Sequence, residues 1–277
     1  MYLTYDLHTH STSSDGILTP SELIIRAAAS GVKTLALTDH DTLDGIPEAT
    51  ATAKLQGINF IAGVEISVTW SEKTIHIVGL NIDTSLKLLH TELEKLCEFR
   101  NWRAEEIARK LASCNIHNAL EGAKALSNGH LISRTHFARF LMHSGFANDE
   151  NEAFKNFLLP SKPGYVQGQW AELEKAISWI TQAGGQAVLA HPTRYNISNK
   201  KLRTLIREFK AYGGAAMEVT SGRFGGQERI AMANLAVKFD LLASAGSDFH
   251  DPKNIATELG KLPLLPANCT PIWYNWS

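Results

Sequence analysis

Short apolar stretches alternate with amphipathic stretches along most of the chain. Apolar runs of strand length predict strands over 2–5, 34–38, 60–67, 75–80, 186–191, 215–219 and 241–245. The period of a helix covers 20–31, 47–56, 173–182, 200–212 and 229–239. Thr19 and Glu22 have the spacing of a capping box at the first helix. Strands that are mostly separated by helices predict an α/β fold, and a parallel barrel in preference to an open sandwich.

The pattern changes between residues 86 and 160, where no strand is evident. Helical periodicity dominates there, over 89–111, 120–127, 134–143 and 148–157. We therefore expect a barrel domain made of residues 1–85 and 161–277. Residues 86–160 are expected to form a helical insertion that contributes part of the substrate site.

Histidine and carboxylate side chains fall at or near the ends of the predicted strands. Because functional groups of parallel barrels lie at the carboxyl ends of strands, we expect these side chains to converge. The set that we expect to be both metal-binding and catalytic is His8, His10, Asp15, His40, Glu65, His76, His191, Asp248 and His250. One ion takes roughly four to six ligands, so the set predicts two or three divalent ions. Imidazole and carboxylate without thiolate are compatible with manganese, iron or zinc, and these ligands do not choose among the three metals. Manganese is the metal that we expect.

Composition narrows the class of protein. The 277 residues carry a formal net charge of -1, which argues against a bulk electrostatic footprint for duplex nucleic acid. No apolar run has the length of a membrane span, and no signal-peptide pattern is present at the N-terminus. Cys97, Cys114 and Cys269 are scattered, as expected for reduced thiols in a cytoplasmic enzyme. We infer neither a membrane nor an obligate protein partner.

Several segments resemble the polymerase-and-histidinol-phosphatase (PHP) superfamily of metal-dependent phosphoesterases. They are Asp6-Leu7-His8-Thr9-His10, Thr38-Asp39-His40-Asp41, Gly63-Val64-Glu65, His76, His191-Pro192 and Ser247-Asp248-Phe249-His250. The resemblance implies a distorted (β/α)7 barrel, the PHP fold, with a trinuclear metal centre. More narrowly, the chain resembles the ribonuclease AM group, bacterial 5′-to-3′ exoribonucleases that also act as nucleoside 3′,5′-bisphosphate phosphatases.

The resemblance also implies how the ligands divide among the ions. One site would use His8, His10, Glu65 and Asp248, a second Asp15, His40 and His250, and a third Glu65, His76 and His191. Glu65 would then bridge two ions. Asp6 and Asp39 are candidates for orienting ligand histidines, with a buried structural role as the equal alternative.

A phosphoesterase also needs cations and a proton donor beside the metals. Arg134 and Arg194 are the candidate phosphate clamps, because a guanidinium matches phosphate oxygens bidentately. His136 is a candidate acid for the leaving group, with packing as the alternative.

Other residues in and near the insertion are expected at the surface or in packing rather than in the reaction. We expect Arg100, Arg103 and Arg109 on a solvated, salt-bridged helix face, with an RNA-approach surface as the weaker alternative. Trp170 and Tyr165 are expected to pack rather than to stack on a base. The remaining histidines of the insertion are expected at the surface or in packing: His90, His117, His130 and His143.

The leading hypothesis is a hydrolase in which a metal-bound hydroxide attacks phosphorus. Its substrates would be 5′-phosphorylated RNA, shortened 5′-to-3′ to mononucleotides, and adenosine 3′,5′-bisphosphate, converted to AMP. The alternatives are a small-metabolite phosphomonoesterase resembling histidinol phosphatase, and a non-catalytic, metal-stabilised module that binds RNA or a polymerase.

Overall fold

The computed structural model describes residues 2–127, 131–222 and 224–276. Seven strands follow one path in the sheet, in the order β1-β2-β3-β4-β6-β7-β8, and β5 pairs beside β3. Their bounds are β1 Tyr5–Asp6, β2 Thr34–Leu37, β3 Asn59–Trp70, β4 Lys73–Leu80, β5 Ala171–Glu172, β6 Gln186–Leu189, β7 Ala216–Ser221 and β8 Leu242–Gly246.

The two ends of this path meet. The Leu7 N–H donates to Ala245 O at 2.9 Å, and the Asp248 N–H donates to His8 O at 2.9 Å. The segment that follows β1 therefore lies beside β8 and the loop after it. The sheet forms a nearly closed barrel, which confirms the predicted α/β barrel fold.

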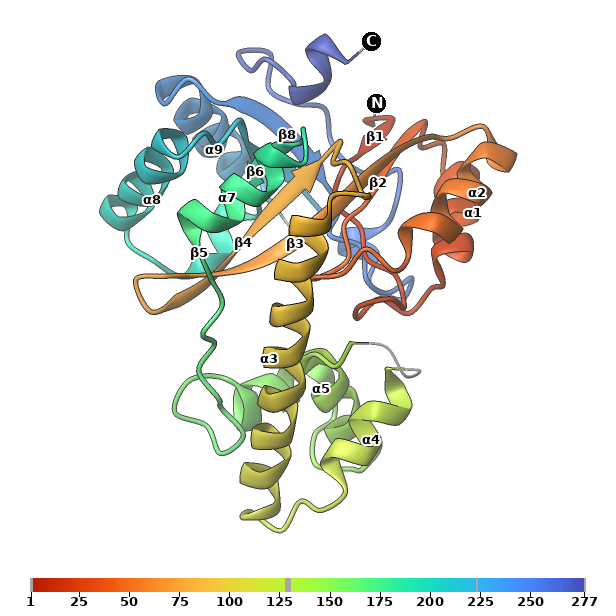
Figure 1. Ribbon diagram of the computed structural model, residues 1–277, viewed down its shortest axis with the longest axis vertical. Helices are drawn as coiled ribbons and strands as arrows, with labels where there is room; N and C mark the ends of the chain where they lie inside the picture. Colours follow the sequence, from red (N-terminus) through yellow and green to blue (C-terminus); the bar gives the residue numbers. More distant parts are fainter. Residues whose placement is uncertain (1, 128–130, 223, 277) are drawn as a thin grey trace.

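Helices cover the outside of the sheet on two sides (Figure 1). Their bounds are α1 Pro20–Ala29, α2 Ile46–Gln56, α7 Leu173–Gln182, α8 Asn199–Ala211 and α9 Gly226–Lys238. The predicted capping box is confirmed at α1, where Thr19 Oγ1 accepts the Glu22 N–H and the Glu22 carboxylate accepts the Thr19 N–H. Among the described residues, no helix combines the length and the apolar character that crossing a bilayer requires.

One strand direction differs from the expected parallel barrel. β4 runs antiparallel to both of its neighbours, β3 and β6. The cause is local, because only Ser71 and Glu72 connect β3 to β4, and both have positive φ, 45° and 63°. A two-residue turn of this kind joins antiparallel strands, whereas a parallel crossover needs a dozen residues or more. The expectation of an all-parallel barrel was therefore wrong at β4.

The barrel interior is filled by small and branched side chains. Leu7, Ala36, Val78 and Val188 belong to one buried cluster, which Ile272 of the short 3-10 helix η4 (Ile272–Asn275) joins. Aromatic side chains near the end of the chain pack against it: the Tyr5 and Trp273 rings stack 4.4 Å apart, and Trp276 Nε1 donates to Gln186 Oε1 at 2.7 Å.

The remaining helices extend away from the sheet along α3 (Figure 1). They are α3 Lys87–Ala112, α4 Ala119–Leu126, α5 Arg134–His143 and α6 Glu150–Ala153, continued by the π-helical turn η1 Phe154–Leu158. Their inner faces form a hydrophobic cluster separate from that of the barrel, in which Ile107, Leu111, Phe137 and Leu141 are almost fully buried. This separate core supports our proposal that residues 86–160 form an insertion subdomain.

The first half of α3 fastens the insertion to the barrel through charge. Arg100, only 6% exposed, donates Nε to Asp41 Oδ2 at 2.8 Å and Nη2 to Ser67 Oγ at 2.8 Å. Asp41 Oδ1 also accepts the Ser67 N–H at 2.7 Å. Arg103 is equally buried, whereas Arg109 is exposed and pairs with Glu106. The expected solvated face was therefore wrong for Arg100 and Arg103, because the barrel covers Arg100 and the segment around Val166 covers Arg103.

This buried pair gives a stability prediction. Replacing Asp41 with Ala leaves the Arg100 guanidinium buried without its carboxylate, and we expect a loss of about 3–5 kcal/mol in the free energy of unfolding. Urea unfolding followed by circular dichroism measures it. Glu106→Ala breaks an exposed ion pair on the same helix and should cause no comparable loss. Equal, small effects of the two substitutions would contradict the importance of the buried pair.

Candidate metal centre

Nine histidine, aspartate and glutamate side chains surround one rim of the barrel. His8, His10 and Asp15 follow β1, His40 follows β2, His191 follows β6, and Asp248 and His250 follow β8. Glu65 and His76 lie within strands β3 and β4. The reversed direction of β4 places His76 opposite Ser67 of β3, so an early position in the strand lies at the same rim as the carboxyl ends of the others.

The structure gathers these side chains into three overlapping groups whose ligand atoms lie within 4.8 Å of one another. The groups are His8, His10, Glu65 and Asp248; His10, Asp15, His40 and His250; and His40, Glu65 and His76. His191 Nε2 lies 3.0 Å from Glu65 Oε1. The resemblance placed His10 in the first site alone and His40 in the second site alone. In the structure His10 also belongs to the second group, and His40 also belongs to the third.

The donor atoms fit a cluster of cations. His8 Nε2 and His10 Nε2 lie 3.1 Å apart, and each faces the Glu65 carboxylate at 3.3 Å. Glu65 Oε2, Asp15 Oδ1, His40 Nδ1 and His76 Nδ1 are buried without a hydrogen-bond partner among the described residues. Buried polar atoms of this kind are normally satisfied, and converging imidazole and carboxylate atoms suit divalent metals.

The pKa shifts of the buried side chains also indicate a site for cations. Burial would raise the pKa of Glu65, but the surrounding histidines His76, His40 and His8 hold it well below its usual range. Burial would lower the pKa of His10, but Asp248 and Glu65 raise it to about 10. The carboxylates therefore draw positive charge to the imidazole nitrogens, and divalent ions would supply that charge in place of protons.

Sequence reasoning missed one carboxylate behind the ligands. Glu218, 1% exposed on β7, lies with Oε1 2.5 Å from His8 Nδ1, and its Oε2 accepts the His191 N–H at 2.7 Å. A carboxylate bonded to the second nitrogen of a ligand histidine fixes the tautomer and the ring orientation. The available signal was a lone acidic residue within the apolar run of 215–219.

Asp6 and Asp39 contact the loops that carry the candidate ligands rather than the ligand imidazoles themselves. Asp6 Oδ1 accepts the Ser247 N–H at 2.8 Å, and burial raises the pKa of Asp6 to about 7. Asp39 accepts hydrogen bonds from the Ser11 N–H, the Ser11 hydroxyl and the Ser14 hydroxyl. Both aspartates hold loops that carry ligands, and the described contacts favour the structural alternative over direct orientation of a histidine.

The insertion reaches the centre through Asp15. Ser133 Oγ and Thr135 Oγ1 each donate to Asp15 Oδ2 at 3.0 Å, and Arg139 Nη2 donates to the Asp15 main-chain oxygen at 3.0 Å. The other oxygen of Asp15 lies 3.1 Å from His250 Nε2. Helix α5 therefore orients a candidate metal ligand that belongs to the barrel.

His136 belongs to the cap of that helix. Its Nδ1 accepts the Ser133 N–H at 3.0 Å, while Ser133 Oγ accepts the Thr135 N–H. The imidazole is 1% exposed, and burial lowers the pKa of His136 to about 4. The ring is therefore neutral near pH 7, and we propose that His136 caps α5 rather than protonates a leaving group.

The two predicted clamps face the same space. A cavity of about 280 Å³ lies over the centre, lined by Arg134, Arg194 and seven of the nine predicted ligands, Asp15, His40, Glu65, His76, His191, Asp248 and His250. Arg194, in the 3-10 turn η2 (Pro192–Tyr195), forms an ion pair with Asp248. Arg134 forms no ion pair among the described residues and lies near the Phe154 ring.

Sequence analysis did not predict Tyr195 as part of the site, although its hydroxyl links the segments that carry His76 and His191. Its hydroxyl donates to Ala190 O at 2.5 Å and accepts the His76 N–H at 3.1 Å.

Trp170 packs as expected, edge-on to Phe99 and beside the Arg100 guanidinium. Of the insertion histidines, His90, His117 and His143 are exposed, and His130 lies outside the described residues.

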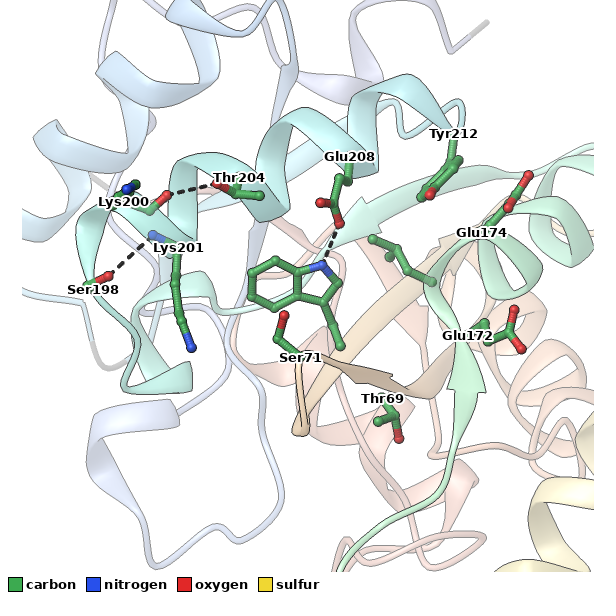
Figure 2. A pocket seen from close by; sticks show the side chains of 12 residues that line it. Thr69, Ser71, Glu172, Glu174, Ser198, Lys200, Lys201, Thr204, Glu208 and Tyr212 are labelled. Carbon is green, nitrogen blue, oxygen red and sulfur yellow. Dashed lines mark hydrogen bonds between the residues drawn. The ribbon is translucent and has the colours of Figure 1, made fainter.

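A second cleft lies away from the metal centre. It has a volume of about 640 Å³ and is bounded by the tip of the β3–β4 hairpin, the start of α7 and helix α8 (Figure 2). Trp70 Nε1 donates to Glu208 Oε2 at 2.6 Å across it. The cleft mixes Lys200 and Lys201 with Glu172 and Glu174 and contains none of the nine predicted ligands.

The chain is similar to known proteins over nearly its whole length. The PHP domain model matches residues 6–190. The 3′,5′-nucleoside bisphosphate phosphatase of Chromobacterium violaceum is 46% identical over 269 residues, 97% of this chain and 94% of that protein. The 5′-3′ exoribonuclease Rnm of Escherichia coli is 46% identical over 274 residues, 98% and 93% of the two chains. A solved amidohydrolase from Chromobacterium violaceum, with bound sulfate and no metal, aligns with a TM-score of 0.94 at 45% identity, covering 98% of this chain and 95% of that chain.

The position of Glu218 gives a prediction about metal affinity. Glu218→Gln removes the charge that orients His8, so we expect the affinity for divalent metal to fall about 10- to 100-fold. Competition with a chromogenic chelator measures it. Glu208→Gln makes the same chemical change in the outer cleft and should leave metal affinity unchanged. An unaltered affinity of Glu218→Gln would remove Glu218 from the support of the centre.

Proposed function

The chain belongs to the PHP domain family, and we propose that it is a metal-dependent phosphoesterase. It hydrolyses 5′-phosphorylated RNA 5′-to-3′ to mononucleotides, and it removes the 3′-phosphate of nucleoside 3′,5′-bisphosphates. The observation that carries this function is the 46% identity, over nearly the whole chain, to relatives named for these two activities. The convergence of nine imidazole and carboxylate side chains on one rim supplies the matching chemistry.

Hydrolysis breaks the same kind of bond in both substrates. In each, a nucleotide with a 5′-phosphate carries a second phosphorus on its 3′-oxygen. Water adds its oxygen to that phosphorus, the bond from phosphorus to the 3′-oxygen breaks, and the 3′-oxygen takes up a proton. The bisphosphate then yields a 5′-nucleotide and phosphate. RNA yields a 5′-nucleotide and a shorter chain whose new end again carries a 5′-phosphate.

We propose that the nine predicted ligands hold two or three divalent ions, with manganese the expected metal. When bound, these ions activate water and neutralise charge on the phosphoryl group. Glu65, His10 and His40 each belong to two groups of ligands, so each is a candidate for either of two sites. Glu218 and Tyr195 keep the surrounding histidines in place.

Arg194 and Arg134 bind and orient the substrate in this proposal. Arg194 is held by Asp248, and its Nη2 lies 3.4 Å from Ser221 Oγ, so its position beside the centre is fixed before substrate arrives. Arg134 lines the cavity above the centre from the insertion side. Preorganised guanidinium groups bind phosphate bidentately and stabilise developing negative charge.

A cytoplasmic location, suggested by the scattered cysteines, stays a prediction.

The Arg134 clamp is tested by separating substrate affinity from metal loading. Arg134→Met should raise KM for adenosine 3′,5′-bisphosphate about 10- to 100-fold, because charge-assisted hydrogen bonds to phosphate are lost. Metal content by mass spectrometry should stay at the wild-type level. Arg203→Met, an exposed position on α8, is the matched control. Loss of metal in parallel with activity would assign Arg134 to the support of the centre instead.

The reaction itself is tested by its products. Metal-loaded protein should release 5′-AMP and phosphate from adenosine 3′,5′-bisphosphate. It should release 5′-mononucleotides from a short RNA only when that RNA has a 5′-phosphate. Liquid chromatography with mass detection identifies both. Activity on simple phosphomonoesters alone would favour a small-metabolite phosphatase, and metal-loaded protein without any hydrolysis would favour a binding module.

A further inference from the structure

The two oxygens of the Asp15 carboxylate have different surroundings. Asp15 is 3% exposed, and its Oδ2 accepts hydrogen bonds from Ser133 Oγ and Thr135 Oγ1, each at 3.0 Å. Both donors belong to the insertion. Asp15 Oδ1 is buried without a hydrogen-bond partner among the described residues, and it lies 3.1 Å from His250 Nε2 and 3.9 Å from His40 Nε2. The insertion therefore holds one oxygen, and the other faces candidate ligands of the barrel.

This division selects the atom of Asp15 that a cation meets. A carboxylate oxygen accepts about two hydrogen bonds, so the two hydroxyl groups use the capacity of Oδ2. Only Oδ1 is left to contribute to the group of His10, Asp15, His40 and His250, the Asp15 group. Hydrogen bonds behind a metal ligand fix its orientation, and their loss commonly weakens metal binding about 10- to 100-fold. The two hydroxyl groups are therefore placed to set the metal affinity of the Asp15 group.

The start of helix α5 fixes both hydroxyl groups. Ser133 is the N-cap of the helix, and its Oγ accepts the Thr135 N–H at 3.0 Å while it donates to Asp15. Further along the helix, Arg139 Nη2 donates to the Asp15 main-chain oxygen at 3.0 Å. The amino end of a helix carries partial positive charge, which also favours a carboxylate beside it. One helix thus holds both the side chain and the main chain of Asp15.

Asp15 is also the residue through which α5 is joined to the barrel. The buried apolar side chains of α5, Phe137, Ala138 and Leu141, belong to the hydrophobic cluster of the insertion. Among the described residues, every hydrogen bond between the barrel and α5 or its N-cap ends on Asp15. The docking of α5 on the barrel therefore rests on a residue that is itself a candidate metal ligand.

Resting on the proposed function, we propose that Ser133 and Thr135 are positioning residues for the ion of the Asp15 group, and that metal loading in turn fastens α5 to the barrel. The two effects have one cause, because the coupling between two binding equilibria is reciprocal. Arg134 lies between the two donors in the chain, so the same coupling steadies the proposed phosphate clamp when metal is bound. The protein thereby links substrate binding to a loaded centre.

The positioning role is tested by removing one hydroxyl group. Thr135 is the cleaner choice, because Ser133 also caps the helix. Thr135→Val keeps the shape of the side chain, and we expect the affinity for one of the bound Mn²⁺ ions to fall about 10-fold or more. Titration of the full-length protein with Mn²⁺, with free Mn²⁺ followed by electron paramagnetic resonance, measures the affinity and the number of ions.

Three variants show whether the effect passes through Asp15. Thr135→Ser keeps a hydroxyl group and should recover most of the affinity. Thr91→Val makes the same chemical change at an exposed position on α3 and should match wild type. In an Asp15→Ala background, which lacks the carboxylate, Thr135→Val should cause no further loss of affinity. A further loss there, or no recovery in Thr135→Ser, would overturn the assignment.

The reciprocal effect is tested by amide hydrogen exchange. In wild-type protein, the amides of α5 should exchange about 10-fold more slowly with Mn²⁺ than after removal of metal by a chelator, because opening of α5 then breaks a contact that metal supports. In Thr135→Val, this slowing should be lost at α5 and kept at residues 6–10, which carry ligands of the barrel. Equal exchange of α5 with and without Mn²⁺ in wild-type protein would overturn the linkage.

Metal binding also separates this inference from the function on which it rests. Wild-type protein that binds none of Mn²⁺, Fe²⁺ or Zn²⁺ would reject the proposed metal centre and the inference together. Wild-type affinity for Mn²⁺ in Thr135→Val, with hydrolysis of adenosine 3′,5′-bisphosphate intact, would overturn the inference and leave the proposed function standing. Thermal melting of each variant distinguishes a local effect from misfolding.

Discussion

Negative charge concentrated among buried side chains is the constraint on which the rest of the structure depends. Glu65 is fully buried, and five histidines lie within 3.3 Å of its carboxylate: His8, His10, His40, His76 and His191. A carboxylate in this position is stable only with positive charge beside it. The fold therefore supplies a rigid ring of ligands, and Glu218 holds two segments of that ring, through His8 and His191, from behind.

The insertion is part of this electrostatic arrangement as well as a cover over it. Arg100 neutralises Asp41 next to His40, and Ser133, Thr135 and Arg139 fix both the side chain and the main chain of Asp15. These contacts hold two ligand-bearing loops against one helical unit. The same unit brings Arg134, the proposed phosphate clamp, to the cavity over the centre, so one set of helices supports the ligand-bearing loops and lines that cavity.

The β3–β4 hairpin shows how topology serves the site. A strictly parallel strand would place its early residues at the opposite rim from the ligands. The two-residue turn at Ser71 and Glu72 reverses β4 and brings His76 to the rim beside Glu65. The tip of the same hairpin also borders the cleft at α8, where Trp70 Nε1 donates to Glu208 Oε2.

Sequence by itself determined the α/β barrel, the helical segment and the set of candidate ligands, because strand and helix periods and metal-binding side chains are local signals. It did not determine the direction of β4, the support by Glu218, or the burial of Arg100 and Arg103. The direction of β4 follows from the two-residue turn at Ser71 and Glu72, whose backbone conformation the strand period does not show. The support by Glu218 and the burial of Arg100 and Arg103 depend on which distant segments meet: Glu218 reaches His8 across 210 residues, and the helical period of α3 does not show what covers these two arginines. Tertiary structure decided them, since burial and counter-charge are properties of the packed chain.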